Sequence, residues 1–407
     1  MRILFVSQEV PPDSAWGGIG TYVDVLSEAL AGKGHDVHVL SVVDRQPRSR
    51  EVRNRVTIHR FALPPVHRPA EHLPETWRRV LLAVSVARLL PKLGLEPDVV
   101  ECPEWMAEGL VLGFDDGVPL VVRLHSSARQ LFPLTGQGRR YRGLDGRLAA
   151  RLEEISARRA HAVISTRSNL EQVAGTMRLD PEALHAIPYP IRLPPLSPLS
   201  ANGAPRVTFV GRLEPRKAPE VVLRAAPKVL AAVPECRFVF VGRDVMPQGS
   251  PSSSEWLRRE AERLGVAHAV ELTGQLDHAA LHAELGRATV CAFPSRWESF
   301  GNVVAEASAV GRPVVATPIP PFRELVKDGT TGRLVSAQDP DGWAEALVDL
   351  LRDRSLAREM GETGARHVAA ISDPARVADL TLAAHEDART RWRRGARSGP
   401  RRLPRRR

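Results

Sequence analysis

The chain has 407 residues, of which 43% are hydrophobic, and a formal net charge of +10. This length and composition fit a globular protein of two domains, and because no apolar run reaches ~18 residues we expect no transmembrane helix. Three scattered cysteines exclude a disulfide framework and favour a reducing, cytoplasmic location.

The positive charge is concentrated at the C-terminus. Residues 389–407 contain ten arginines and no acidic residue, so the rest of the chain is neutral overall. Such a Gly/Pro/Arg segment is typical of a disordered tail, which we place at residues 392–407. Arg391–Arg407 could contact the anionic inner face of the cell membrane, or this end could simply be solvated. We expect no nucleic-acid partner.

Short apolar segments alternate with helix-like segments from the first residues onward, which predicts an α/β fold with parallel sheets. In the first half the expected strands are residues 2–7, 36–42, 56–61, 97–101, 119–124, 161–165 and 185–188. Expected helices between them are 19–33, 76–93 and 146–158. We assign residues 1–190 to a first domain.

A Pro/Ser-rich, aperiodic stretch at residues 191–205 is interpreted as a linker, after which the alternation restarts. The second domain, residues 206–372, has expected strands at 206–210, 237–241, 269–273, 289–293, 313–316 and 332–335. Its expected helices are 217–232, 254–264, 278–286, 301–310 and 340–353. Two doubly wound domains of this kind bind ligands at the carboxyl ends of their strands.

A glycine-containing loop, residues 11–20, separates the first strand from the first helix. Gly17 and Gly18 let the backbone approach a phosphate, and the helix behind them offers free N–H groups, although such turns are also common without a ligand. The third glycine of a dinucleotide fingerprint is missing, because position 23 is valine. From position alone, Glu9 and Trp16 are candidates to line an acceptor site.

His125 directly follows the expected strand 119–124. A lone histidine at a strand end is more often structural than catalytic. Its chemical use would be a hydrogen bond to a reacting sugar or acceptor.

Two cations, Arg212 and Lys217, lie five residues apart between the first strand and first helix of the second domain. Arginine can clamp two phosphate oxygens and lysine acts as a compact charge, so the pair can converge on one diphosphate. Arg216, next to Lys217, is a weaker candidate for binding the diphosphate. Charged residues in this position are also common on ordinary surfaces.

Residues 294–306 place Glu298 and Glu306 on either side of a Phe-Gly-Asn turn that starts a helix. Over helical residues this spacing separates the two acids by ~12 Å, with the free N–H groups of the helix start between them. A nucleoside-diphosphate sugar has a matching layout of sugar diol, diphosphate and ribose diol. One of these acids could instead be a simple cap, but Glu306 lies in an apolar run where an unpartnered charge is costly.

This Glu-x7-Glu pattern, with Pro294-Ser295 before it and Gly311–Thr317 after it, resembles the signature of glycosyltransferase family 4. The glycine loop and the Arg212–Lys217 segment occur in the family's order, and the resemblance covers most of residues 1–390. It implies the GT-B fold, two Rossmann-like domains facing across a cleft, with a helix at about 373–391 crossing back to the first domain.

The resemblance also implies the activity. It is a retaining, metal-independent transfer of a sugar from a nucleoside-diphosphate sugar to an acceptor hydroxyl in glycan, glycolipid or secondary-metabolite biosynthesis, without a cofactor. Uridine is our first choice of base and guanosine our second.

Roles follow from the resemblance residue by residue. Arg212, Lys217 and the amides near Gly18 and Gly301 would hold the leaving diphosphate. Glu298 would grip the donor sugar, Glu306 the ribose diol, and His125 would face the anomeric carbon. The remaining donor contacts are expected from Gly17 and from the turn residues Ser299, Phe300, Gly301 and Asn302.

Other functions stay open at this point. The Asp339-Pro340-Asp341 segment suits a helix cap better than a Mg²⁺ site, so we expect no metal. A nicotinamide-dependent oxidoreductase or epimerase is disfavoured by the missing glycine and by the lack of a Tyr-x-x-x-Lys pair. An inactive scaffold that binds RNA or membrane through the arginine tail is the other alternative.

Overall fold

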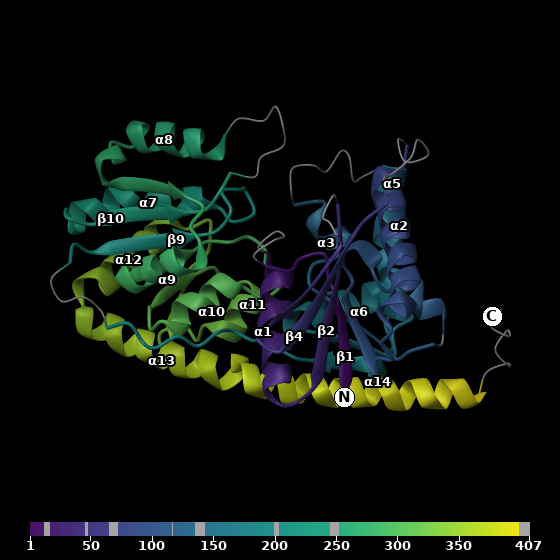
Figure 1. The fold of residues 1–407 in the computed structure, drawn as a ribbon. Coiled ribbons are helices and arrows are strands. Elements are labelled where there is room, and N and C mark those ends of the chain that lie inside the picture. Colours follow the sequence, from purple (N-terminus) through teal and green to yellow (C-terminus); the bar gives the residue numbers. More distant parts are fainter. Residues whose placement is uncertain are drawn as a thin grey trace. The chain divides into compact units, whose positions relative to one another are not determined.

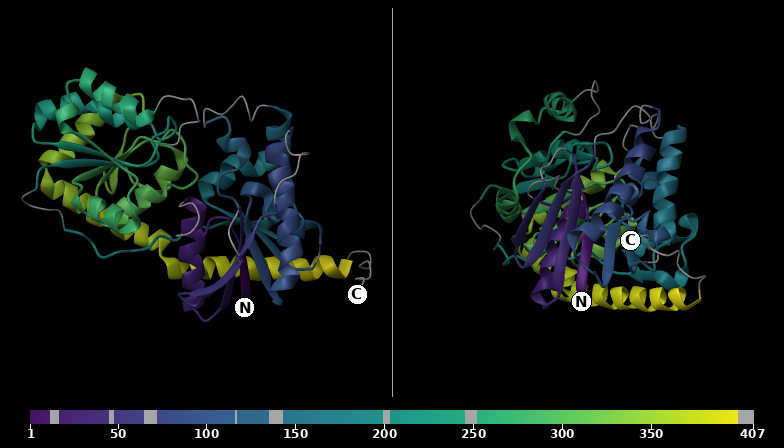
Figure 2. Two further views of the ribbon diagram at one scale, coloured as in Figure 1. Left: turned by 45° about the horizontal axis from the view of Figure 1, so that its top comes forward. Right: turned by 45° about the vertical axis from the view of Figure 1, so that its right-hand side comes forward.

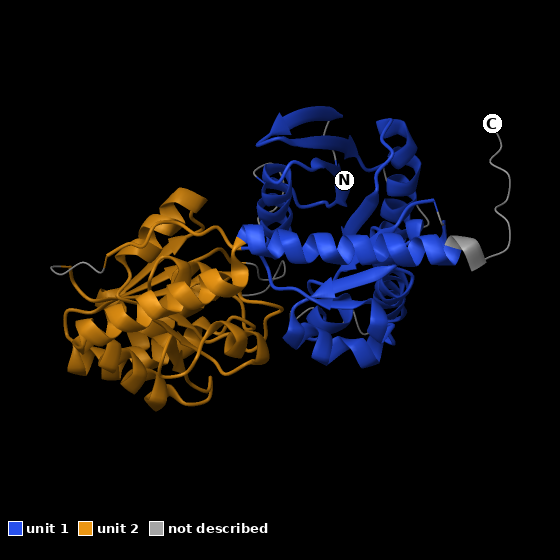
Figure 3. Ribbon diagram, turned by 90° about the horizontal axis from the view of Figure 1, so that it is seen from below, with its two compact units in different colours: residues 1–133, 138–190, 374–407 blue, residues 134–137, 191–373 orange. Residues whose placement is uncertain are grey.

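The computed structural model describes residues 1–11, 17–44, 48–64, 72–115, 117–134, 143–198, 203–244 and 252–398. The chain divides into two compact units, blue and orange in Figure 3. Unit 1 comprises residues 1–133, 138–190 and 374–407, and unit 2 comprises residues 134–137 and 191–373. Each unit contains one sheet flanked by helices, and the prediction of two Rossmann-like α/β units is confirmed (Figure 1).

The sheet of unit 1 has the strand order β3-β4-β2-β1-β5-β6-β7-β8 in the described residues. Its strands are β1 (Arg2–Val6), β2 (Asp36–Val43), β3 (Ser49–Arg53), β4 (Val56–Ala62), β5 (Val99–Pro103), β6 (Leu120–Arg123), β7 (Ala162–Ser165) and β8 (Leu184–Ala186). All neighbours pair in parallel except β3, which runs antiparallel to β4. The central strands are buried on both faces, which explains why they appear in the sequence as continuous apolar runs.

The main helices of unit 1 are α1 (Gly18–Gly32), α2 (Pro74–Leu89), α5 (Leu144–Arg158), α6 (Arg167–Met177) and α14 (Pro374–Ser398), with the short α3 (Ala128–Leu131). Short 3₁₀ turns include η2 (Leu90–Leu93) and η3 (Trp105–Ala107). Neither β3 nor α6 is among the elements expected from the sequence. The strand β3 lies at the sheet edge, and its sequence Ser-Arg-Glu-Val-Arg contains one apolar residue, so it carries little strand signal.

Unit 2 has the strand order β11-β10-β9-β12-β13-β14, with every pair parallel. Its strands are β9 (Arg206–Val210), β10 (Arg237–Val241), β11 (Val270–Gly274), β12 (Val290–Phe293), β13 (Val314–Ala316) and β14 (Gly332–Leu334). Its helices are α7 (Pro219–Ala232), α8 (Ser253–Arg263), α9 (His278–Arg287), α10 (Asn302–Ala309), α11 (Pro320–Leu325), α12 (Pro340–Arg352) and α13 (Arg354–Ser372). Helices α11 and α13 were not expected from the sequence.

The last helix, α14, belongs to unit 1 and runs along its sheet (Figures 1 and 2). Several polar contacts of α14 hold it there. The Asp379 carboxylate pairs with Lys33 at 2.8 Å, the buried His385 bonds Glu101 of β5 at 2.7 Å, and Arg389 bonds Asp98 at 3.1 Å.

The predicted boundary between this helix and the disordered tail, after residue 391, is wrong. The helix was expected to end near residue 391, but α14 continues to Ser398. The reason is that Arg391 does not face open solvent: it bonds Asp180 at 3.0 Å and Asp387 at 3.1 Å, which extends the anchored part of the helix. Residues 399–407 lie outside the described residues.

Candidate functional site

The site of unit 2 lies at the point in its sheet where the order of the strands reverses. Strand β9 has β10 on one side and β12 on the other, so the chain crosses the sheet in opposite directions from β9. In open α/β sheets, ligands bind at the carboxyl ends of the two strands flanking such a switch point. Arg212 and Lys217 follow β9, and Glu298 follows β12. The topology therefore brings the predicted cations and the predicted carboxylate together.

Glu298 is the centre of a buried ion-pair cluster. Its side chain is 9% exposed, and Oε1 is bonded to Lys217 Nζ and accepts a hydrogen bond from Ser295 Oγ at 2.9 Å. The other oxygen, Oε2, accepts from Arg216 Nη1 at 3.2 Å. Two cations from the loop after β9 thus converge on one carboxylate from the loop after β12.

Arg216 fixes this arrangement, although from the sequence it was a weaker candidate for phosphate binding than Arg212 and Lys217. Its side chain is 5% exposed and donates to Glu214 Oε1 from Nε at 3.0 Å and from Nη2 at 2.6 Å. Nη1 also donates to the Trp297 carbonyl oxygen at 3.0 Å. Arg216 therefore links both loops and serves Glu298 as a positioning residue, while the more exposed Arg212 contacts Glu214 only at 3.3 Å.

Backbone contacts hold the loop that carries these cations, after β9, against the end of β10 and the residues that follow it. Leu213 N–H donates to the Arg243 carbonyl at 2.9 Å, and Gly211 N–H donates to the Val241 carbonyl at 2.9 Å. Gly242 has φ +151°, and a Cβ there would lie 1.8 Å from the Gly211 carbonyl oxygen. Only glycine permits this approach, so the direction of the Arg212 loop is built into the backbone.

The charges of the cluster are set by its surroundings. Burial alone would raise the pKa of Glu298, but Lys217 and Arg216 outweigh burial and lower it to about 2. Burial lowers the pKa of Lys217, and the Glu298 carboxylate only partly offsets that effect. Glu298 therefore stays ionised at neutral pH and holds Lys217 in place.

Helix α10 begins beside this cluster. Its first turn follows Gly301, which has φ +104° and at which a Cβ would lie 2.5 Å from Phe322 Cε1. No other residue fits there without strain, because the left-handed backbone and the close Phe322 ring both require glycine. Of the predicted donor contacts in this turn, Phe300 is buried while Ser299 and Asn302 are half-buried.

Glu306 is half-buried in the second turn of α10. Burial raises its pKa to about 7, against the nearby positive charge of Lys217. Within the described residues its carboxylate has no hydrogen bond or ion-pair partner. Lys217 is thus electrostatically coupled to both predicted carboxylates, and Glu306 is the one whose acceptor sites are all open among the described residues.

His125 lies at the carboxyl end of β6 in unit 1 and is 3% exposed. Its Nδ1 is 2.5 Å from the Tyr189 hydroxyl, and its backbone N–H donates to Glu104 Oε2 at 2.7 Å. Burial and the charge of Arg123 lower its pKa well below the usual range, so the ring is neutral. A Tyr189 hydroxyl that donates to Nδ1 leaves the ring hydrogen on Nε2. The role of His125 near the anomeric carbon stays a prediction.

The start of helix α1 already holds a carboxylate. Glu9 Oε2 accepts from Gly20 N–H at 3.0 Å, and a Cβ on Gly17 would lie 2.5 Å from the same oxygen. The amides near Gly18 are therefore faced by Glu9, and a diphosphate bound at these amides would have to displace it. Trp16, the other predicted acceptor residue, lies outside the described residues.

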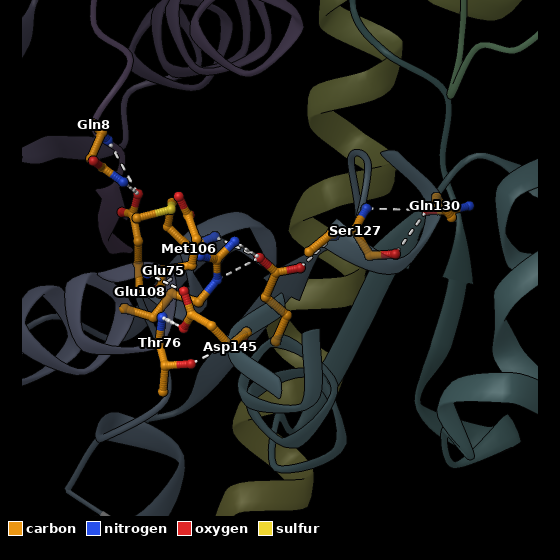
Figure 4. A network of polar contacts seen from close by, with 11 residues as sticks. Gln8, Glu75, Thr76, Met106, Glu108, Ser127, Gln130 and Asp145 are labelled. Carbon is orange, nitrogen blue, oxygen red and sulfur yellow. Dashed lines mark hydrogen bonds and ion pairs between the residues drawn. The ribbon is translucent and has the colours of Figure 1, made fainter. Parts of the chain in front are cut away.

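Buried acids also support the switch point of unit 1, between β1 and β5, and the sequence reasoning missed them. Glu108 accepts from Gln8 Nε2 at 3.2 Å, and Glu153 holds Arg79 and the backbone N–H groups of Met106 and Ala128 (Figure 4). Burial raises the pKa of Glu108 to about 8. These acids fix the loops after β1, β5 and β6. The apolar stretch around Glu108 could have pointed to that residue, whereas Glu153 lies among other charged residues and carries no such signal.

Within the described residues, no group of three or more His, Cys, Asp or Glu side chains is placed to hold a metal ion. The same part of the chain contains no helix with both the length and the hydropathy needed to cross a bilayer. Asp339 caps α12 by accepting from Gly342 N–H at 2.9 Å, as expected for the Asp339-Pro340-Asp341 segment.

Two Rossmann-like units, with a cation–carboxylate cluster at the switch point of the second, are the architecture of a GT-B glycosyltransferase. Comparison with known proteins agrees. The family model for group 1 glycosyl transferases matches residues 197–367, and the glycosyl transferase 4-like domain matches residues 17–190.

The chain is 31% identical to the D-inositol 3-phosphate glycosyltransferase of Acidothermus cellulolyticus, over 88% of this chain and 83% of the relative. It is 28% identical to a glycogen synthase of Mycobacterium tuberculosis, over 99% of this chain and 98% of the relative. The chain belongs to the group 1 glycosyltransferases of family 4 and is an enzyme of that class.

Solved structures support the fold. The sucrose-phosphate synthase of Thermosynechococcus elongatus matches with a TM-score of 0.73 and 24% identity, covering 95% of this chain and 98% of that one. Anabaena HepE in complex with UDP and glucose matches with a TM-score of 0.69 and 20% identity, covering 94% and 98%.

Proposed function

We propose that the chain transfers a sugar from a nucleoside-diphosphate sugar to an acceptor hydroxyl, with UDP the favoured carrier and GDP the second choice. Retention at the anomeric carbon and independence of metal belong to the same proposal. The observation that carries it is the convergence of Lys217, Glu298 and Arg216 at the switch point, beside the start of α10. The Glu306 carboxylate of α10, which has no partner in the part of the chain that the structure describes, lies on the same helix. HepE and a trehalose-6-phosphate structure from E. coli hold UDP or a UDP-sugar, which favours uridine here.

Donor binding would redistribute the charges of this cluster. Lys217 would turn from Glu298 toward the diphosphate, joined by Arg212 and the free N–H groups of α10. Glu298 would then accept hydrogen bonds from the donor sugar. An oxygen of the departing diphosphate would take the acceptor proton on the same face, since no residue stands out as a covalent nucleophile. The acceptor itself is left as a hydroxyl of a glycan, glycolipid or secondary metabolite.

The first test is calorimetric titration of the full chain with UDP, GDP, ADP and TDP, with and without Mg²⁺. We expect metal-independent binding, strongest for UDP. Failure of all four nucleotides to bind would overturn the proposal.

Retention is tested separately. The chain is incubated with a UDP-sugar and a simple alcohol acceptor, and NMR gives the anomeric configuration of the product.

Substituting Glu306 by glutamine is expected to weaken nucleotide binding ~10- to 100-fold, because a hydrogen bond to a charged acceptor contributes ~1.5–3 kcal/mol. The affinity of the wild type should also rise with pH. Glu306 has a pKa of about 7 and binds the ribose diol best when it is ionised, so affinity increases through neutral pH and levels off above it.

The pH dependence is checked by repeating the titration between pH 6 and 8 on both proteins. Ionisation of the nucleotide phosphate, with a pKa of ~6, affects both proteins equally and is removed by the comparison. Identical pH profiles for wild type and Glu306→Gln would show that Glu306 does not contact the nucleotide.

A further inference from the structure

Unit 1 contains a cavity of about 410 Å³ that the proposed transfer reaction does not use. It is lined by residues near the amino end of β2, by β3 and β4, and by the segment that leads into β5. The acids and His125 of unit 1 lie instead at the carboxyl ends of the strands. The volume falls within the ~300–1,000 Å³ typical of small-molecule sites.

The rim of this cavity is strongly cationic. Arg48 and Arg50 of the β3 edge and Lys92 of η2 are exposed around it, and the described lining residues include no carboxylate. Two acids close in sequence to lining residues already have cationic partners: Asp36 is paired with Arg2 at 2.7 Å, and Glu51 with Arg60 at 3.0 Å. Three cations without a local counter-charge favour an anionic ligand with several oxygens.

The base of the cavity is a pair of stacked histidines. The rings of His38 and His59 lie 5.3 Å apart between centroids, and His38 Nδ1 is 3.1 Å from His59 Nε2. Burial lowers both pKa values, that of His59 to about 4, so both rings are neutral. His38 Nε2 lies 2.9 Å from Asp36 Oδ1 and must donate to it, which makes His38 Nδ1 the acceptor for His59.

This chain of hydrogen bonds fixes what His59 can offer a ligand. Since Nε2 of His59 carries its hydrogen, Nδ1 is a bare acceptor, and it has no partner among the described residues. A neutral ring acceptor suits a ligand hydroxyl rather than a phosphate oxygen, which has no hydrogen to donate once ionised. The base and the rim therefore recognise different parts of one ligand.

The wall between base and rim is apolar. Phe61 is half-buried, and the Arg48 guanidinium lies over its ring at 5.2 Å from the centroid. Leu93 and Leu95 complete this wall. An apolar wall beside a hydroxyl acceptor and a cationic rim is suited to the carbon face of a sugar ring.

We propose that this cavity is a second ligand site of unit 1 and that it binds a small phosphorylated sugar or sugar alcohol. Arg48, Arg50 and Lys92 take the phosphate, Phe61 supports the ring, and His59 Nδ1 accepts a hydroxyl hydrogen. The site is independent of the transfer site, so it stands whether or not the proposed donor is correct.

The test is calorimetric titration of the full chain with glucose 6-phosphate, inositol 1-phosphate, inorganic phosphate and glucose. We expect a sugar phosphate to bind at least ~10-fold more tightly than inorganic phosphate, and glucose not to bind detectably. The double variant Arg50→Ser, Lys92→Gln should weaken sugar-phosphate binding at least ~10-fold. Arg88→Ser, which removes an exposed cation of α2 that does not line the cavity, should leave it unchanged.

A third variant separates this cavity from the transfer site. Arg212→Gln removes a predicted diphosphate contact of unit 2, and it should leave sugar-phosphate binding unchanged while weakening nucleotide binding. The proposal is overturned if no sugar phosphate binds, if the double variant binds as the wild type does, or if Arg212→Gln alone abolishes binding. Thermal unfolding of each variant verifies that these exposed substitutions leave the fold intact.

Discussion

Glu298→Gln is expected to lower the turnover number ~10²- to 10³-fold, the size of effect seen when one preorganised electrostatic contact to a reacting group is lost. Two causes act together. Glutamine cannot hold Lys217 and Arg216 by charge, so Lys217 is no longer positioned for the diphosphate, and the donor sugar loses its charged acceptor. Initial rates with the UDP-sugar identified by titration measure the effect.

The same substitution should also destabilise unit 2. Glu298, Lys217 and Arg216 have side-chain exposures of 9%, 12% and 5%, so the variant leaves two largely buried cations without their shared anion. Breaking a buried pair by removing one partner costs ~3–5 kcal/mol. Glu220→Gln is the matched control in unit 2, because its partner Arg296 is 47% exposed and such a pair contributes only ~0–1 kcal/mol.

The acid sensitivity of this contribution has a definite sign. The folded-state pKa of Glu298 is about 2, below the ordinary value of 4.5, so its stabilisation is complete above pH 4.5 and is lost as pH falls toward 2. Urea denaturation across this range should show the gap between wild type and Glu298→Gln closing in acid. If Glu298→Gln had both the turnover number and the unfolding midpoint of the wild type, the role assigned to Glu298 would be wrong.

Glu153→Ala should produce a comparable loss of stability in unit 1, ~3–5 kcal/mol, with no contact to any substrate. Glu153 and Arg79 are both fully buried and bonded at 2.8 Å, so alanine leaves the guanidinium without its main anion. The Met106 and Ala128 N–H groups, bonded to Glu153 at 3.2 and 2.7 Å, also lose their acceptor. Each such unsatisfied buried donor costs a further ~1–3 kcal/mol unless the loop moves to water.

The neighbouring Glu154→Ala is the control for Glu153→Ala. Glu154 contacts Arg129 and Arg151, whose side chains are 56% and 52% exposed and can return to solvent. Because a chain of two units can unfold in more than one step, amide hydrogen exchange is the better measurement. Protection of residues 125–131 should fall in Glu153→Ala and not in Glu154→Ala, while unit 2 keeps its protection in both. Equal exchange in the two variants would disprove the supporting role of Glu153.

The sequence predicted the fold and part of the site for a simple reason. Parallel strands buried on both faces leave unmistakable apolar runs, and their carboxyl ends meet at one edge, so Lys217 and Glu298 could be expected at the same edge of the sheet without coordinates. Their ion pair was not predicted. Arg216 and Arg212 could not be ranked in the same way. Which of two nearby arginines turns inward depends on the loop, where Ala218 adopts φ +53° just before α7. No spacing rule reveals that choice.

Contacts made across long stretches of sequence were equally out of reach. His125 is bonded to Tyr189, 64 residues away. The contact of Glu9 with the Gly20 amide spans only 11 residues, but it too could not be predicted, because it depends on how the loop between them folds. Both depend on tertiary packing. The end of α14 was misplaced because the acids that hold Arg391 include Asp180, which is far away in the sequence.

The anchoring of α14 has a consequence for how the protein is made. Unit 1 is interrupted in the sequence by unit 2, and its sheet gains the His385–Glu101 contact only from the last helix. A ribosome therefore releases nearly all of unit 2 before it has synthesised the helix that completes unit 1. Since domains generally fold as units during synthesis, unit 2 is the first that can close, and unit 1 waits until α14 has been synthesised.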